Sequence, residues 1–220
     1  MVLFPGGWRW VPTLLVLLLG IGQAAAETEV RDFKVMVDDK DAGAYHMTLT
    51  EKDGVVTMTG AARVKVSYVV VSYKYDYAGT ETWKDGRLQA FRSSCNDDGK
   101  KHEVSAYIDG KDLRVKADGK DSKTSVDTWL TSYWHLPDAT LRKGGLSLMD
   151  ADTGKLMTGK LGYIGKETMT VGGKEQVCFH YRLTGDVSVE LWYDGSDRLV
   201  RQEWKEDGHK TVLLLDRVGK

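Results

Sequence analysis

The stretch Val64–Tyr77, VKVSYVVVSYKYDY, and the segment after it, Thr80–Cys95, decide the fold. Valine, tyrosine and tryptophan dominate these residues, and such side chains suit a pleated, half-buried surface. The pattern predicts one long strand, a short turn and a second hairpin that closes at Asp85-Gly86. At a period of two, one face of the strand holds Val69, Val71, Tyr73, Tyr75 and Tyr77, and the other holds Val64, Val66, Tyr68 and Val70. Because both faces are apolar near the middle, we expect this strand at the centre of the fold.

Turn signals recur along the chain from Val30 onward. Asp-Gly between alternating runs is a strong hairpin signal, because both central residues of such a turn need positive φ. The expected turns are Lys52-Asp53-Gly54, Lys84-Asp85-Gly86-Arg87, Asp97-Asp98-Gly99, Asp109-Gly110, Asp118-Gly119, Asp152-Thr153-Gly154, Gly172-Gly173, Asp194-Gly195 and Asp207-Gly208. Their even spacing predicts an all-β, single-domain antiparallel meander. So many strands rarely stay flat, so we expect a strongly curved sheet that forms an open or flattened barrel.

Two C-terminal hairpins can be placed in register. In the first, a three-residue loop at 184–186 would pair Leu183 with Val187 and Tyr181 with Val189, which makes one face wholly apolar. Its other face would hold Cys178, His180, Arg182, Ser188, Glu190 and Trp192. The last hairpin would place Val200, Trp204, Leu213 and Leu215 on one face, and Arg201, Glu203, Lys205, Lys210 and Asp216 largely on the other.

One segment departs from the strand pattern. In residues 126–136, VDTWLTSYWHL, Trp129 and Tyr133 are four positions apart, as are Leu130 and Trp134. This is helical spacing, and the following Pro137 would end a helix. We expect a short helix or aromatic loop across one opening of the sheet, acting either as a plug that completes the core or as a mobile lid over a cavity.

The N-terminus has the pattern of a signal peptide. Arg9 is followed by a short apolar run over residues 11–22 and by Ala24-Ala25-Ala26, an A-x-A cleavage site. The run is shorter than the ~20 residues that a membrane span needs. We therefore expect residues 1–26 to be removed and residues 27–220 to form one β domain. The product would be a soluble exported protein, periplasmic in a Gram-negative host, with no stable membrane span.

Composition excludes one class of partner. The formal net charge is −1, and removal of the signal segment removes only one charged residue, Arg9, which makes it −2. Charges of both signs are interspersed, without the basic stripe of a nucleic-acid-binding protein.

The two cysteines, Cys95 and Cys178, are candidates for a disulfide, because an oxidising compartment favours pairing. The alternative is a reactive or metal-binding thiol. Cys178, His180 and Glu190 include zinc-ligand types, but C-x-H within a strand is not a zinc motif. We expect an exposed His180–Glu190 pair across the strands instead. No cofactor, metal or catalytic arrangement is predicted.

Aromatic residues supply the candidate ligand-binding set. Tyrosine and tryptophan combine apolar area with a polar tip, which suits sugars, lipids and protein partners. The residues proposed to bind a ligand are Tyr73, Tyr75, Trp129, Tyr133 and Trp134. Ordinary packing in the core and at its rim is the alternative for the same residues.

Four strings carry a family resemblance: YKYDYAGTETWKDGRL (Tyr73–Leu88), TSYWH (Thr131–His135), HYRLTGD (His180–Asp186) and LWYD (Leu191–Asp194). Together they resemble a family of uncharacterised exported bacterial proteins with a DUF6134-like domain of unknown function. The resemblance implies no activity. By analogy of fold, it is similar to periplasmic proteins whose curved sheet surrounds a lipid-like ligand, such as the lipoprotein carriers. Neither cysteine belongs to these motifs.

Three functional hypotheses remain open. The first is a non-enzymatic periplasmic carrier of an apolar or amphiphilic small molecule, which the aromatic set favours. The second is an envelope structural or interaction protein with a filled core, whose protein partner the sequence does not identify. The third is an enzyme acting on envelope glycans or lipids, which would require His180, Arg182 and Glu190 to lie within a cleft.

Overall fold

Antiparallel strands follow one another along most of the chain. The computed structural model describes residues 26–67 and 72–220. Its strands are β1 (Glu27–Val37), β2 (Lys40–Lys52), β3 (Val55–Ser67), β4 (Ser72–Lys84), β5 (Arg87–Asp97), β6 (Lys100–Asp109), β7 (Asp112–Ala117), β8 (Lys120–Ser125), β9 (Trp129–Leu130), β10 (Leu146–Met149), β11 (Leu156–Val171), β12 (Lys174–Gly185), β13 (Val189–Tyr193), β14 (Leu199–Glu206) and β15 (His209–Gly219), with a 3-10 turn, η1, at Leu141–Lys143.

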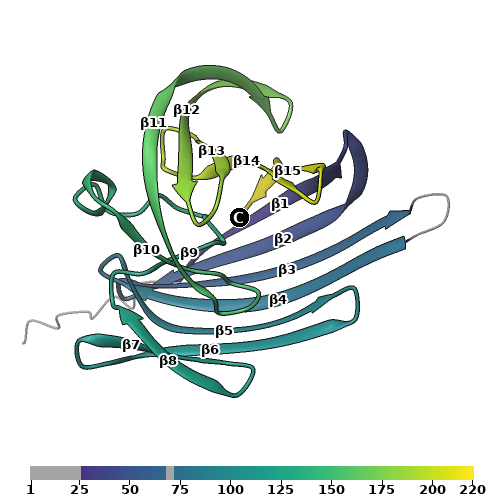
Figure 1. Cartoon of the computed structure of the whole chain (residues 1–220). Coiled ribbons are helices and arrows are strands. Elements are labelled where there is room, and N and C mark those ends of the chain that lie inside the picture. Colours follow the sequence, from purple (N-terminus) through teal and green to yellow (C-terminus); the bar gives the residue numbers. More distant parts are fainter. Residues whose placement is uncertain (1–25, 68–71) are drawn as a thin grey trace, which may run out of the picture.

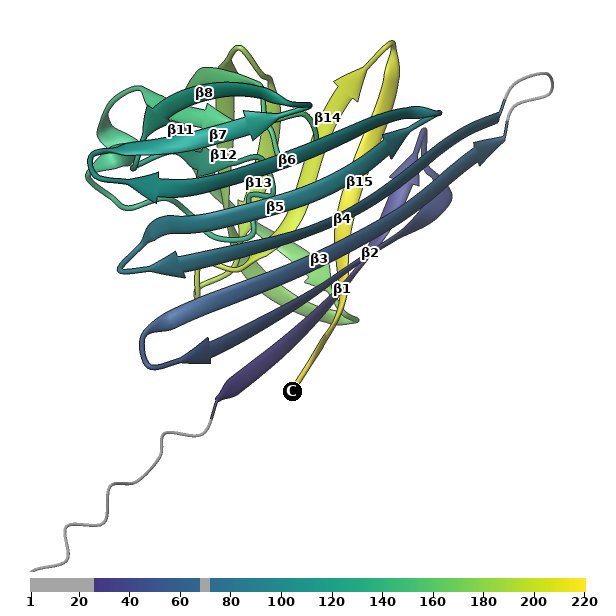
Figure 2. The ribbon, with the colours of Figure 1, turned by 90° about the horizontal axis from the view of Figure 1, so that it is seen from below.

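All of the strands belong to one sheet. Its order is β8-β7-β6-β5-β4-β3-β2-β1-β15-β14-β13-β12-β11-β10-β9, so β8 and β9 are its two edges. Every pair of neighbours is antiparallel except β9 and β10, which run parallel. The sheet curls without closing: β1–β8 lie side by side, and β11 and β12 arch over the interior (Figures 1 and 2). The predicted all-β fold with a strongly curved, open barrel-like sheet is confirmed.

The hairpin turns are where the sequence places them. In five Asp-Gly turns both residues have positive φ: those beginning at Asp53, Asp85, Asp98, Asp118 and Asp207. The other predicted turns also lie between successive strands. The turn between β1 and β2 was not predicted, because Asp38 and Asp39 adopt positive φ there without a glycine.

The prediction of one long strand over residues 64–77 is wrong. The chain reverses between Ser67 and Ser72, which pair with each other, and β3 and β4 form a hairpin. Four residues of the predicted faces, Tyr68, Val69, Val70 and Val71, lie outside the described residues. Val64 on β3 is paired with Tyr75 on β4. The two residues were predicted on opposite faces of one strand, but as a cross-strand pair they lie on the same face of the sheet. The hairpin still lies inside the sheet, with β2 and β5 as its neighbours.

The register predicted for β12 and β13 is also wrong. Leu183 pairs with Val189 and Tyr181 with Leu191, two residues away from the prediction, because residues 184–188, and not 184–186, separate the last paired residues. A shift of two residues keeps every side chain on its predicted face. The faces predicted for the last hairpin are confirmed where burial tests them: Val200, Leu213 and Leu215 are buried, and Trp204 is partly buried against the core.

Residues 126–136, all of them described, contain no helix. Trp129 and Leu130 form β9 beside β10, and Tyr133 has a φ of +48°. The Trp129 and Tyr133 rings nevertheless contact each other, with centroids 4.8 Å apart. We call residues 129–136 the plug, because they are largely buried on the interior face of the sheet.

The predicted disulfide is not formed. Cys95 on β5 and Cys178 on β12 are free and buried. Seven strands separate β5 from β12 in the sheet order, so the two cysteines are not on neighbouring strands. Both thiols behave as small apolar core groups, as buried free cysteines commonly do.

Candidate functional site

The interior face of β4 holds a row of aromatic and acidic side chains. Tyr73 and Tyr75 are half-buried near one end, whereas Tyr77, Glu81 and Trp83 are buried further along the strand. Alternation along a strand places all five on one face. The row therefore runs from a partly open end of the sheet into the core.

Glu81 is the most unusual member of this row, since its side chain is fully buried. Its Oε2 accepts hydrogen bonds from the indole nitrogens of Trp83, at 2.7 Å, and Trp134, at 2.8 Å. Burial raises the pKa of Glu81 to about 7, although hydrogen bonds from Ser132, Trp134 and Trp83 favour the charged form. The carboxyl thus joins β4 directly to the plug.

A second, half-buried carboxyl, that of Asp152, lies near the half-buried tyrosines. The Tyr75 hydroxyl donates to Asp152, at 3.0 Å from each carboxylate oxygen. Burial, and next the negative charge of Asp150, raise the pKa of Asp152 to about 7. Burial and the charge of Asp152 also raise the pKa of the neighbouring Cys95 thiol to about 12, so this thiol is not the activated nucleophile considered above.

Apolar side chains surround the exposed end of the row. Val64 and Val66 on β3 are paired with Tyr75 and Tyr73, and both valines pack on the core. The pKa of Tyr73 is raised chiefly by burial and next by the hydrogen bond and charge of Asp97. The charge of Glu206, at the end of β14, raises it further, so Glu206 lies nearby. This end, which we call the mouth, combines aromatic rings, aliphatic side chains and carboxylates.

The candidate ligand-binding residues fall into two groups. Tyr73 and Tyr75 are at the mouth and partly accessible, whereas Trp129, Tyr133 and Trp134 belong to the plug and are buried. Of these three candidate residues of the plug, Trp134 donates a hydrogen bond to the row on β4. In this conformation the plug rings pack against the protein itself, and their role in binding a ligand stays a prediction.

Three residues that matter here were missed by the sequence analysis. Glu81 shares the parity of Trp83 and Tyr77 on β4, and this signal could have placed it inside. Arg31 on β1 is buried and donates from Nη1 to the Trp134 carbonyl, at 2.9 Å. Asp152 was read only as a turn residue, and no local pattern indicates that it folds back onto Tyr75.

The His180–Glu190 pair is formed, but it is not exposed as predicted. His180 is 8% exposed, and its ring is stacked on Trp192 with centroids 4.2 Å apart. Its Nε2 lies 2.7 Å from Glu190, and its Nδ1 lies 2.8 Å from Glu167 without the angles of a hydrogen bond. His180 is opposite Trp192, and Arg182 is opposite Glu190, as the shifted register requires. Within the described part of the chain, no group of three or more His, Cys, Asp or Glu side chains is arranged to hold a metal ion.

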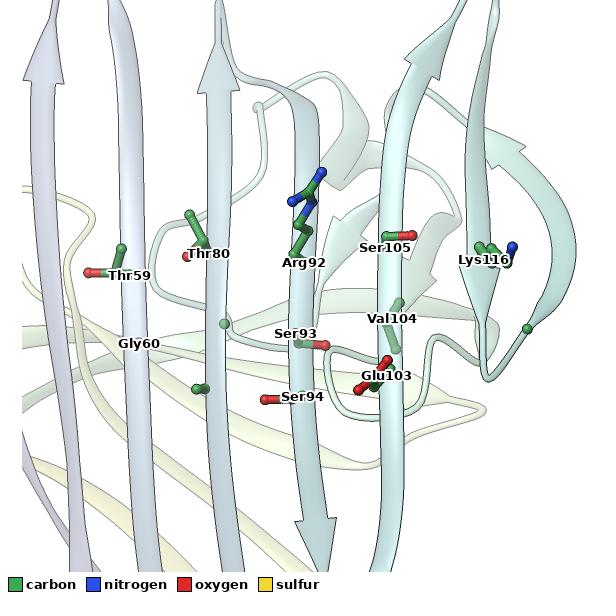
Figure 3. Close-up of a pocket in the computed structure, with 13 residues that line it drawn as sticks. Thr59, Gly60, Thr80, Arg92, Ser93, Ser94, Glu103, Val104, Ser105 and Lys116 are labelled. Carbon is green, nitrogen blue, oxygen red and sulfur yellow. The ribbon is translucent and has the colours of Figure 1, made fainter.

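Two hollows lie on the outer face of the sheet. One, of about 640 Å³, has small side chains from β3, β4 and β5 in its floor, and Arg92, Glu103 and Lys116 beside them (Figure 3). The other, of about 590 Å³, shares Ala78, Ser94 and Glu103 with the first. Neither hollow includes His180, Arg182 or Glu190, which the enzyme hypothesis requires in a cleft.

None of the helices in the described chain has the length and apolarity needed to cross a membrane.

Comparison with solved structures supports the barrel-like fold. No curated protein matches the chain. Among solved structures, it is similar to a crystal structure from Brucella abortus, described as a beta-barrel-like protein of domain of unknown function DUF1849. The TM-score is 0.63 at 10% sequence identity, and the match covers 87% of this chain and 96% of the other. At this identity the likeness concerns the fold alone.

The family model for a domain of unknown function, DUF6134, matches residues 33–216. The match spans the strands that form the row on β4, the plug and the mouth, and on this basis the chain belongs to the DUF6134 family.

Proposed function

We propose that this protein is an exported, non-catalytic binding protein that carries an apolar or amphiphilic molecule on the interior face of its curved sheet. The observation that supports this most is the way in which the interior is filled. Beyond β9, the plug is held there by side-chain contacts and a few backbone hydrogen bonds, and not by a continuous ladder. Its aromatic rings occupy space that the apolar body of a ligand could take.

The mouth supplies the entry for such a ligand. Tyr73 and Tyr75 are partly accessible, and Val64 and Val66 extend the apolar surface toward the core. The expected path runs from the mouth along β4, where the ligand would displace Trp129, Tyr133 and Trp134 from the interior face and contact their rings as it enters. The sheet does not need to open, since its edges β8 and β9 are already unjoined.

Binding is tested with an anthroyloxy-labelled stearic acid, titrated into the purified protein and followed by its fluorescence. Saturable binding is expected, and Tyr73→Ala should weaken it by about tenfold, which corresponds to ~1.4 kcal/mol, within the value of one buried aromatic contact. Tyr107→Ala is the matched control, because Tyr107 is an exposed tyrosine on β6. Absence of saturable binding, or equal losses in both variants, would count against the carrier.

Export is the second half of the proposal. Residues 1–26 would direct the chain out of the cytoplasm and be removed, which leaves Glu27 as the first residue. The mass of the protein recovered from the periplasmic fraction of a Gram-negative host tests this: the mass of residues 27–220 is expected. Recovery of the full-length mass from the cytoplasm would contradict it.

A second candidate, a protein-interaction role, is favoured by the hollows on the outer face. Arg92 and Lys116 form no ion pair with another described residue, so their charges are available to a partner. A photo-crosslinking amino acid at Ser94 would then give a discrete adduct in host cells, and Arg92→Glu would abolish it. Such a result with no fatty-acid binding would favour this role over the carrier.

A further inference from the structure

One of the contacts between the plug and the sheet is made by a buried acidic group, Glu81. The indole nitrogen of Trp134 donates to Glu81 on β4, and two more plug residues contact this strand: Ser132 at Glu81 and His135 at Trp83. On the other side, Arg31 holds the Trp134 carbonyl, and its guanidinium carbon lies 5.9 Å from the centre of the Trp134 ring. The Glu81–Trp134 hydrogen bond is thus a direct link between the plug and the row of side chains on β4.

The charge on this acidic group is poorly compensated. Among the described residues, no cation forms an ion pair with Glu81, and its Oε1 is buried without a hydrogen-bond partner. The hydroxyl of Tyr77, on the same face of β4, is also buried and unpaired. An ionised carboxylate in this place relies on neutral donors alone, and two of the three, Ser132 and Trp134, belong to the plug.

The other titratable groups around Glu81 do not supply a counter-charge. Burial is the main cause that raises the pKa of Tyr45 on β2 and of Tyr77 on β4, and the Glu81 charge adds to it, so both hydroxyls stay neutral. His135 in the plug packs edge-on against Trp83, and burial lowers its pKa to about 4. Asp152, whose charge also acts on both tyrosines, is a second acid, and Arg31 is engaged with Glu29 and the Trp134 carbonyl.

We propose that Glu81 is a protonation-controlled latch, which keeps the plug seated while the carboxyl is neutral and loosens the plug when the carboxyl ionises. The latch itself needs no ligand, whereas its role as a gate rests on the carrier function proposed above.

The direction follows from linkage. With the plug seated, the pKa of Glu81 is about 7, whereas a carboxyl reached by water titrates near its ordinary value of 4.5. The seated state therefore binds the proton more tightly, and raising the pH shifts the balance toward the loosened state. Between pH 4.5 and pH 7, each pH unit changes the ratio of loosened to seated protein by up to tenfold. Over the whole range, from well below pH 4.5 to well above pH 7, this ratio rises by roughly 300-fold.

The test is ¹⁹F NMR of protein containing 5-fluorotryptophan, recorded from pH 5 to pH 9 without ligand. The Trp83 and Trp134 signals, assigned by Trp→Phe variants, should shift together with a midpoint near 7. Above the midpoint, the Trp134 signal should gain the H₂O/D₂O isotope shift of a solvent-accessible ring. Both effects should disappear in Glu81→Gln, which keeps an oxygen acceptor for the indoles but cannot ionise.

Matched controls separate this group from other acids. Outside the plug, the Trp192 indole donates to Glu167 at 3.0 Å, so this pair resembles Trp134 and Glu81. The variant Glu167→Gln should therefore leave the pH titration of the Trp134 signal unchanged. Asp152→Asn should leave it intact as well. If Glu81→Gln does not fold, Trp134→Phe replaces it: loss of a donor to the charged form should move the Trp83 midpoint to higher pH.

Several results would overturn the latch. The first is an absence of titration at Trp83 and Trp134 between pH 5 and pH 9. The second is a titration that survives in Glu81→Gln or vanishes in Asp152→Asn. A Trp134 ring that stays closed to solvent above the midpoint would show that Glu81 titrates without moving the plug. Because no ligand is present, these results are independent of whether the fatty acid binds.

Discussion

Two carboxyl groups, that of the buried Glu81 and that of the half-buried Asp152, lose contact with water at a cost in free energy. Hydrogen bonds from the protein offset part of this cost. Glu81 accepts from two indoles, and Asp152 accepts from one tyrosine. In both cases desolvation is the largest cause of the pKa change, and it raises the pKa to about 7. Carboxyls with such values change their charge near neutral pH, so the interior of this protein is sensitive to pH where most carboxyls are not.

The first prediction concerns the pH dependence of stability. The folded-state pKa of Glu81 lies above the ordinary value of 4.5, so its favourable contribution is complete below pH 4.5 and is lost as the pH rises through 7. In urea unfolding experiments, wild-type protein should lose up to ~3 kcal/mol over this range relative to Glu81→Gln. Asp152→Asn is expected to remove a separate part of the loss. Parallel pH profiles for wild type and Glu81→Gln would contradict the assignment.

The second prediction concerns Gly79 on β4. A Cβ at this position would collide with the hydroxyl of Tyr77, whose ring lies across the glycine. Gly79→Ala should destabilise the protein by about 1–3 kcal/mol, the usual cost of overpacking a core. Thr80→Ala, one residue further on the exposed face, is the control and should stay within about 0.5 kcal/mol. Equal unfolding midpoints in urea for Gly79→Ala and wild type would rule out this close approach.

At the scale of elements, the plug shows why the sequence misled us about residues 126–136. Aromatic residues four positions apart meet on a helix, yet Trp129 and Tyr133 meet here through a turn with a left-handed residue. The pairing of β9 with β10 joins residues nineteen positions apart, and no local pattern encodes it. The four-residue spacing of Trp129 and Tyr133 thus correctly predicted that their rings meet, but it wrongly predicted a helical backbone between them.

Hairpin β12–β13 shows a different reason for error. We chose its loop length by requiring an apolar face, but two registers that differ by two residues satisfy this requirement equally. The longer loop in the structure brings Arg182, and not His180, opposite Glu190. The Asp-Gly turns were predicted correctly because the requirement for positive φ is local to two residues.

The third prediction concerns the strands that contain the cysteines. Because Cys95 and Cys178 are free, unreduced protein unfolded in guanidinium chloride should react with two equivalents of Ellman's reagent. A reducing agent should leave the melting temperature unchanged, since it removes no cross-link. Fewer than one reactive thiol per chain before reduction, with two after it, would establish a disulfide and contradict the structure.

At the scale of the whole molecule, the open sheet and its plug form one system. The strands from β1 to β8 and the arch of β11 and β12 enclose a core that the plug completes (Figure 1). The curved antiparallel architecture was predictable because turn spacing and strand count require it. The packing of the plug, Arg31 and Asp152 was not predictable, because it depends on contacts between residues 53 to 103 positions apart.

The account depends most on the claim that a ligand and the plug compete for the interior face. Hydrogen–deuterium exchange, measured by mass spectrometry with and without saturating stearic acid, tests it most directly. The account predicts faster exchange in peptides covering residues 129–136 when the ligand is bound, and slower exchange at the start of β4. Saturable binding of stearic acid with no change in the exchange of residues 129–136 would contradict it.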